Sequence, residues 1–343
     1  MARLFIDGFE SGTYGLWDTY GGGGSYTLQL DTTPVAPGGS VYSFEMHSGN
    51  FTAYGYLVKN ISPATPNTIY FKFMYRCGVN NAGIEVVTFY NGSGGQLALC
   101  LETSGVLSIR KTSRTGTLLV SGVTTINTNT WYQIEGKFVL DASVGIGTIK
   151  VNGLADISYS GNTHNQTADT ITKVYLGMLQ ASLTVTGYVS PVYDDFVLDD
   201  ANWIGQSYIL PLKPSGAGAE TQLTPSAGSN YSCVNSVPIS DSNNVSTNTP
   251  DQKDTYVKPV LATNLSVNCL QMLARATSTG TPACGGAKHI LRIGGIDYYS
   301  PRLAVPVGSY SDLLTLYSVS PATSIPFTIA EVNAMEMGVQ MVA

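Results

Sequence analysis

Apolar and polar side chains alternate along much of the first two hundred residues. The segments "YTLQLDT", "VYSFEMHS", "YGYLVKNI" and "TIYFKFMYRC" all show this period of two, which is typical of β-strands. In the last of them Ile69, Phe71 and Phe73 share one face, while Tyr70 and Lys72 share the other. No convincing amphipathic helix interrupts the series. Many short strands separated by turns predict a sandwich, jelly roll or barrel.

Two glycine-containing stretches predict turns between these strands. Asn152-Gly153 lies between two strand-like runs and predicts a hairpin, because a type I′ turn needs positive φ at both central residues. The run Gly21–Gly24 is not a phosphate loop, since no Lys-Ser/Thr and no helical pattern follow it. We therefore expect this run to be a turn.

The composition changes after Trp203 and suggests a domain boundary. We predict a first domain over 1–205, a Pro/Gly-rich linker or arm over 206–232 and a second domain over 233–343. Strand-like patterns return in the second domain. Near its end Thr328 and Glu331 have capping-box spacing, which predicts a short helix before a final strand "GVQMV".

Charge and cysteine content exclude several classes of protein. With Lys+Arg 17 against Asp+Glu 23 and a net charge of -6, no basic face for nucleic acid is visible. No run approaches the ~20 apolar residues of a membrane span, and the N-terminus lacks a secretion-signal pattern, so we expect synthesis in a cytoplasm. Five widely spaced cysteines without a CxxC pair predict buried thiols.

The segment "PVYDDFVLDD", residues 191–200, concentrates four aspartates in a chain with few charges. A glycosidase needs two carboxylates about 5.5 Å or roughly 6.5–9.5 Å apart. Asp195 and Asp199 share a strand face but are four residues apart, which corresponds to about 13 Å. The favoured interpretation is a closing strand in which Phe196 and Leu198 enter the core and the acids stay solvated.

Calcium binding is the alternative interpretation of these acids. Carboxylates near both ends of the first domain would converge if its first and last strands pair. The candidate ligands are Asp7, Glu10, Asp194 and Asp195. Ca²⁺ is the one cofactor that the sequence suggests.

No residue is assigned a catalytic role. The chain has no Gly-x-Ser-x-Gly, and its histidines lie far apart in sequence. We therefore expect that the protein is not an enzyme. Aromatic residues in or beside loops could stack on sugars, and the candidates for carbohydrate binding are Trp17, Tyr20, Tyr54, Tyr56 and Tyr90.

The order of four segments resembles the closing half of a laminin-G-like, concanavalin-type jelly roll. These segments are "WYQIEGKF", "GTIKVNG", "KVYLGML" and "YDDFVLDD". The resemblance implies an all-β protein, with a concanavalin-like sandwich over 1–205 and a smaller β-rich domain with a short helix behind it. It implies no particular activity, because this fold serves lectins, glucanases and structural modules.

A second resemblance spans nearly the full length. The opening "MARLFIDGFESGTYGLWD", the segment "LPLKPSGAGAETQLTPSAGSNYSCVN" and the ending "PFTIAEVNAMEMGVQMV" are similar to structural proteins of tailed bacteriophages. This resemblance implies a virion protein on the particle surface: a capsid decoration, fibre or tail-associated subunit. Its expected partners are other virion proteins and copies of itself, for example in a trimer.

The alternative function is a carbohydrate-binding adhesin. In this hypothesis the jelly-roll loops bind a glycan on the host surface, with or without calcium. The two functions can coexist in one molecule.

Overall fold

The computed structural model divides the chain into two compact units. One consists of Met1–Glu10 and Trp17–Leu210, the other of Ser11–Leu16 and Pro211–Ala343. The residues that the structure describes are 3–48, 53–61, 66–78, 83–92, 94–166, 168–179, 190–280 and 284–343. We call the two parts the first and the second unit and describe each by itself.

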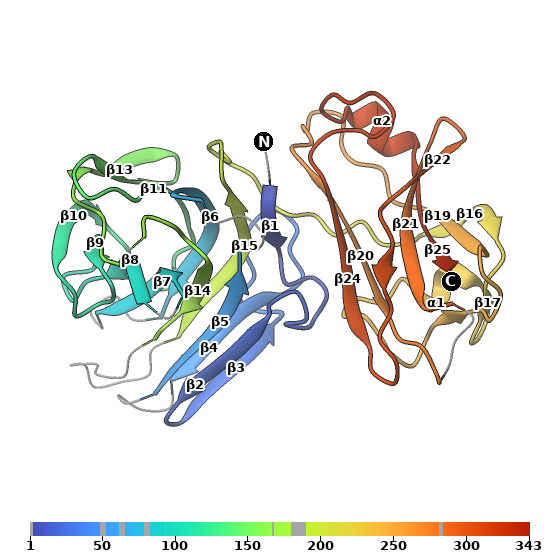
Figure 1. The fold of residues 1–343 in the computed structure, drawn as a ribbon, viewed down its shortest axis with the longest axis horizontal. Helices are drawn as coiled ribbons and strands as arrows, with labels where there is room; N and C mark the ends of the chain where they lie inside the picture. The colour runs from blue at the N-terminus through green and yellow to red at the C-terminus, as the bar shows by residue number, and fades with distance from the viewer. Residues whose placement is uncertain are drawn as a thin grey trace. The chain divides into compact units, whose positions relative to one another are not determined.

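The first unit contains an eight-stranded antiparallel sheet (Figure 1). In spatial order its strands are β13 (Leu154–Gly161), β12 (Gly145–Val151), β11 (Tyr132–Val139), β6 (Thr68–Cys77), β15 (Pro191–Asp199), β4 (Ser43–Ser48) and β3 (Tyr26–Asp31), with β1 (Arg3–Asp7) paired to β15. Strand β1 runs antiparallel to β15, with Asp7 opposite Phe196, so the pairing of first and last strands that the calcium interpretation required is present.

A seven-stranded antiparallel sheet forms the other layer of the first unit (Figure 1). Its strands are, in order, β10 (Leu118–Thr125), β9 (Val106–Lys111), β8 (Gly94–Leu101), β7 (Ile84–Asn91), β14 (Lys173–Gly177), β5 (Tyr54–Asn60) and β2 (Thr19–Gly23). The predicted all-β sandwich is confirmed. The turn predicted at the glycine run is wrong, because three of its glycines belong to β2 and pair with β5 through their backbones.

The core lies between the two sheets, and the predicted alternation is visible in it. Ile69, Phe71 and Phe73 of β6 are fully buried, and the Phe71 ring lies 5.1 Å from that of Phe89 in the other sheet. Burial of such side chains stabilises the fold by about 1.5–3 kcal/mol each. However, Lys72 on the opposite face of β6 is fully buried as well. A simple two-layer sandwich would leave that face in water.

The predicted hairpin at Asn152-Gly153 is confirmed. These residues connect β12 to β13, with φ values of 51° and 80°. Both values lie in the left-handed region, as a type I′ turn requires.

The second unit is also built from strands. Its largest sheet contains β16 (Gly216–Thr221), β19 (Lys253–Val257), β25 (Glu336–Val342), β21 (Gly286–Ile293) and β22 (Ile296–Tyr299), with β23 (Leu303–Ala304) paired to β21. Two smaller antiparallel pairs are β20 (Leu270–Ala276) with β24 (Ser311–Tyr317) and β17 (Thr224–Pro225) with β18 (Val245–Ser246). The helices are α1 (Asn230–Cys233) and α2 (Ile329–Ala334).

The end of the second unit follows the sequence pattern. The Thr328 side chain accepts a hydrogen bond from the Glu331 backbone N–H at 3.1 Å, which is the predicted cap of α2. The predicted final strand is β25. A short segment from near the N-terminus, Ser11–Leu16, also belongs to this unit, where the Ser11 carbonyl accepts a hydrogen bond from Ile239 N–H at 3.0 Å.

The structure departs from the predicted linker over 206–232. Residues 216–221 form strand β16, which pairs antiparallel with β19. In this pairing Gly216 lies opposite Val257. The small side chains that suggested a flexible arm are instead those of a sheet-edge strand. Composition alone did not distinguish the two, because glycine and alanine carry little information about pairing.

The described residues bear on two features examined in the sequence: membrane-spanning segments and cysteines. Within them, no helix is long and apolar enough to cross a bilayer. All of their cysteines are free thiols; Cys269 is half-buried and the others, Cys77, Cys100, Cys233 and Cys284, are buried.

Candidate functional site

The acid-rich strand β15 is buried on both of its faces. Phe196 and Leu198 enter the core as predicted. The expectation that the acids stay solvated is wrong, because Asp194, Asp195 and Asp199 are at most 1% exposed. A β-bulge at this point gives Asp195 a φ of 51° and turns its carboxylate onto the outer face of the sheet.

Residues 201–210, which we call the strap, cover that outer face. Their backbone N–H groups donate to buried carboxylates: Glu135 Oε1 accepts two such bonds at 2.7 Å each, and Asp195 Oδ1 accepts one at 2.7 Å. Lys72 Nζ donates to a strap carbonyl at 2.5 Å and lies 3.6 Å from Asp195 Oδ2. Glu135, Asp195 and Lys72 therefore hold the strap on the sheet.

The four calcium candidates are likewise bound to the protein's own backbone and side chains. Asp7 accepts hydrogen bonds from Phe9 N–H at 2.7 Å and from Trp17 Nε1 at 2.8 Å. Glu10 accepts from the N–H of Val41 at 2.8 Å. No group of three or more His, Cys, Asp or Glu among the described residues could hold a metal ion.

Burial also shifts the pKa values of two of these acids. Burial raises the pKa of Glu10 to about 7. Burial, with a further contribution from the negative charge of Asp195, raises the pKa of Asp194 to about 8. Both carboxyl groups therefore hold a proton more tightly in the folded protein than they would in water.

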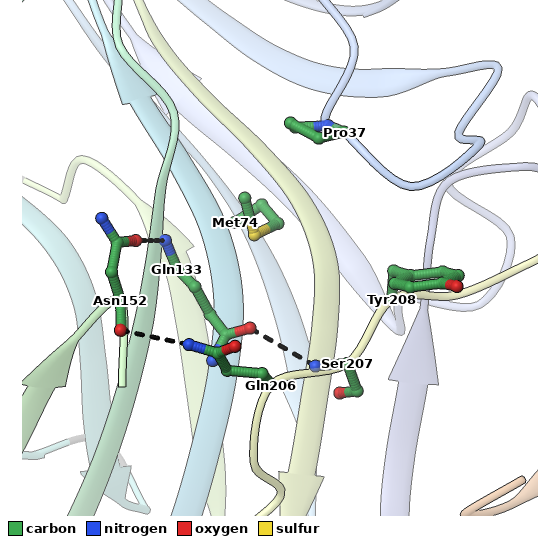
Figure 2. A pocket seen from close by; sticks show the side chains of 7 residues that line it. All are labelled: Pro37, Met74, Gln133, Asn152, Gln206, Ser207 and Tyr208. Carbon is green, nitrogen blue, oxygen red and sulfur yellow. Dashed lines mark hydrogen bonds between the residues drawn. The ribbon is translucent and has the colours of Figure 1, made fainter. Parts of the chain in front are cut away.

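A pocket of about 450 Å³ opens between the strap and the eight-stranded sheet (Figure 2). It is lined by Pro37, Met74, Gln133, Asn152, Gln206, Ser207 and Tyr208. Its side-chain amides bond to backbone groups, as the dashed lines in Figure 2 show: Asn152 Oδ1 accepts from the Gln133 backbone N–H at 2.8 Å, and Gln206 Nε2 donates to the Asn152 backbone carbonyl at 3.1 Å. These bonds help to hold the strap on the sheet.

The outer face of the seven-stranded sheet carries a row of four tyrosines, which we call the tyrosine row. Tyr54 and Tyr56 come from β5, Tyr175 from β14 and Tyr90 from β7. Neighbouring ring centroids lie 6.4 Å (Tyr54–Tyr56), 5.3 Å (Tyr56–Tyr175) and 4.5 Å (Tyr175–Tyr90) apart. All four side chains are partly exposed, whereas their strand neighbours on the other face are in the core.

The glycines of β2 make room for two of these rings. Gly23 pairs with Tyr54 and Gly21 with Tyr56. A Cβ at Gly23 would lie 2.6 Å from the Tyr54 ring, and one at Gly21 would lie 3.3 Å from the Tyr56 hydroxyl. The missing side chains therefore allow the rings to lie over the edge strand.

Buried polar groups flank the row on β7. Thr88 lies opposite Tyr175, is fully buried, and its hydroxyl has no hydrogen-bond partner among the described residues. Burial raises the pKa of Glu85, whose Oε1 accepts from Arg114 N–H at 2.9 Å. Burial also raises the pKa of Tyr90, with further contributions from Tyr175 and Glu85.

The structure separates the five aromatic candidates named from the sequence. It brings Tyr54, Tyr56 and Tyr90 together. Trp17 is only 5% exposed and lies in the core, its ring 5.1 Å from that of Phe5, so it cannot stack on a ligand at the surface. Tyr20 is 64% exposed but pairs with the core residue Leu57, which places it on the other face of its sheet.

Sequence reasoning missed Tyr175, the central ring of the row. It lies in the segment "KVYLGML", where its alternation with core residues Val174 and Leu176 was the available signal. That alternation shows which face Tyr175 occupies but not which other strands lie beside it.

No protein-family model matches the chain, and no curated protein sequence matches it. Among solved structures the chain is similar to a cellulose induced protein, Cip1, with 14% identity and a TM-score of 0.44 over 60% of this chain and 99% of that chain. It is also similar to a carbohydrate esterase from the Shiga toxin-encoding bacteriophage phi24B, with 10% identity and a TM-score of 0.40 over 59% and 99%. The alginate lyase Aly36B shows 14% identity and a TM-score of 0.35 over 47% and 83%.

This comparison contradicts the prediction that the chain is not an enzyme. The similar structures include alginate lyases, a carbohydrate esterase and a sialidase, all of them enzymes by name. That prediction is not carried further.

Proposed function

We propose that the first unit binds a carbohydrate chain on the tyrosine row. The observation that carries this proposal is the row itself: four partly exposed rings from three adjacent strands, spaced 4.5–6.4 Å apart. A tyrosine offers an apolar ring face together with a hydroxyl that donates and accepts hydrogen bonds. Sugars present the same combination of C–H faces and hydroxyl groups.

The binding surface is prepared before any ligand arrives. The rings contact one another, and the glycines of β2 leave space for two of them, so few rotamers have to be ordered on binding. Preorganisation of this kind reduces the entropic cost of association. The carbohydrate-related names of the similar structures agree with the proposal but do not carry it.

The decisive experiment measures glycan binding by the full chain and its tyrosine variants. We expect Tyr175→Ala and Tyr56→Ala each to weaken binding by about tenfold or more, because truncation of an aromatic residue at the centre of a binding surface commonly costs about 2 kcal/mol or more. Tyr20→Ala is the matched control, since it removes an exposed tyrosine from the same sheet but from the other face.

The same samples should be assayed for cleavage of the bound glycan. New reducing ends would indicate hydrolysis, and unsaturated products would indicate elimination. Equal binding by the wild type, Tyr175→Ala and Tyr56→Ala would overturn the tyrosine row as the binding surface.

We further propose that this binding takes place on a virus particle. The support is the similarity of the opening, middle and closing segments to structural proteins of tailed bacteriophages. The partners would then be other virion proteins, with self-association such as a trimer. Quantitative mass spectrometry of purified particles tests this: hundreds of copies indicate a capsid decoration, a small multiple of three indicates a tail or fibre, and absence overturns the virion assignment.

A further inference from the structure

One cationic side chain of the first unit differs from all the others. Its other lysines and arginines have partners: Arg3, Lys59, Lys72, Arg110 and Lys150 pair with carboxylates, Arg76 and Lys111 donate to amide oxygens, Lys137 lies over the Tyr70 ring, and Arg114 also makes a contact. The Lys173 side chain has no ion pair, hydrogen bond or ring contact among the described residues, although its backbone pairs with the neighbouring strands.

Lys173 belongs to the outer face that carries the tyrosine row. It is the first residue of β14 and pairs with Tyr90 on one side and Asn60 on the other. Alternation along β14 puts Lys173 on the same face as Tyr175, two residues later. Directly opposed residues in an antiparallel pair have Cβ atoms about 4.5–5.5 Å apart, so Lys173 and Tyr90 leave the sheet as neighbours on this face.

We infer that the carbohydrate bound on the tyrosine row is acidic, and that Lys173 binds its anionic group. The inference rests on the proposed function. Stacking on the rings would place the sugar, and the lysine ammonium would form a charge-assisted hydrogen bond to a carboxylate or sulfate at the end of the row. The Lys173 side chain is partly exposed and has no partner among the described residues, so its ammonium is accessible to an anionic ligand.

The charge of the whole protein makes this contact decisive. The net charge is -6, so no long-range field draws a polyanion to the surface. Selection for an acidic glycan then depends on local contacts, among which Lys173 is the one free cation described on this face. A single substitution should therefore abolish most of the selectivity.

The test compares three classes of polysaccharide with the full-length protein. Alginate and polygalacturonate carry carboxylates, dextran sulfate carries sulfate esters, and dextran and mannan are neutral. We expect at least one acidic class to bind roughly tenfold or more tightly than the neutral polymers, and the binding to weaken as salt is raised. The class that binds identifies the anionic group.

Substitutions then locate the selectivity. We expect Lys173→Met to lower the affinity for the acidic polymer roughly tenfold while leaving the melting temperature unchanged, and Lys173→Arg to retain most of it. Lys137→Met is the matched control: it removes the same charge from the other sheet, on which Lys137 lies over Tyr70, and should leave binding unchanged.

The outcomes separate the inference from the proposed function. Equal affinity for neutral and acidic polymers, or no effect of Lys173→Met on acidic binding, overturns the inference and leaves the carbohydrate site standing. No binding of any class overturns both.

Discussion

The outer faces of the two sheets of the first unit use polar residues in opposite ways. On the eight-stranded sheet, Lys72, Glu135 and Asp195 are buried and bonded to the strap, which is part of the same chain. On the seven-stranded sheet, the tyrosine row stays partly exposed. The first face is covered by the chain's own strap, whereas the second presents partly exposed rings and a lysine that has no side-chain partner among the described residues.

This difference shows that an unusual cluster of charges is weak evidence for a functional site. The four aspartates of "PVYDDFVLDD" are the most conspicuous feature of the sequence, yet most of their contacts are with backbone N–H groups of the chain itself. The tyrosines are dispersed along the sequence and become a surface only in the fold. A charged group indicates a site mainly when the structure leaves it without a partner.

The largest effect that distinguishes the two faces is expected from Lys72→Met. Removal of one partner from a buried ion pair leaves an uncompensated charge on Asp195, at a cost of about 3–5 kcal/mol. Denaturant unfolding followed by tryptophan fluorescence measures it selectively, because all three tryptophans, Trp17, Trp131 and Trp203, belong to the first unit.

Lys137→Met provides the control for this experiment. It removes the same charge from the same sheet, but its ammonium lies over the Tyr70 ring and has no carboxylate partner among the described residues. We expect a change below about 1 kcal/mol. Equal destabilisation by the two variants would contradict a special role for the Lys72 pair.

The stability of the first unit should fall as pH rises from about 5 to 8. Asp194 and Glu10 have pKa values raised to about 8 and about 7, so the folded state binds more protons than the unfolded state across this window. Burial lowers the pKa of Lys72, and this acts in the opposite direction at the alkaline end. A net loss of about 1 kcal/mol would lower Tm by about 2–4 °C.

Asp194→Asn sharpens the pH experiment. Asparagine cannot ionise, so the dependence of Tm on pH should become shallower, while variants of the tyrosine row should keep the wild-type slope. Thermal melts monitored by tryptophan fluorescence at several pH values between 5 and 8 measure both. A slope in Asp194→Asn as steep as that of the wild type would show that Asp194 is not responsible.

The smallest expected effect concerns the glycines beneath the tyrosine row. A methyl group at Gly23 would lie 2.6 Å from the Tyr54 ring and must displace it, whereas one at Gly21 would lie 3.3 Å from the movable Tyr56 hydroxyl. We therefore expect Gly23→Ala to weaken glycan binding several-fold and Gly21→Ala to weaken it less, each with a stability change of about 1 kcal/mol or less. Calorimetric titration of the two variants should show this order; the reverse order would contradict the positioning role of Gly23.

Local patterns in the sequence predicted much of the fold. The alternation of Ile69, Phe71 and Phe73 identified the core face of β6, Asn152-Gly153 identified the hairpin, and Thr328 identified the start of α2. Each of these features depends on residues close together in the chain. The glycine run was misinterpreted because a strand of glycines has no side-chain pattern, and its pairing with β5 is a long-range property.

What the sequence determined by itself is the all-β class, the inward face of its strands and several turns, because strand period, turn conformation and capping are local. What only the tertiary structure decided is the fate of the outer faces. The strap buries Lys72 and the aspartates. The contact between Lys72 and Ser207 joins segments that are more than a hundred residues apart in the chain. The tyrosine row likewise requires β5, β7 and β14 to lie side by side. Burial of a charge and exposure of an aromatic ring both depend on what covers them, and long-range strand pairing and packing determine that cover.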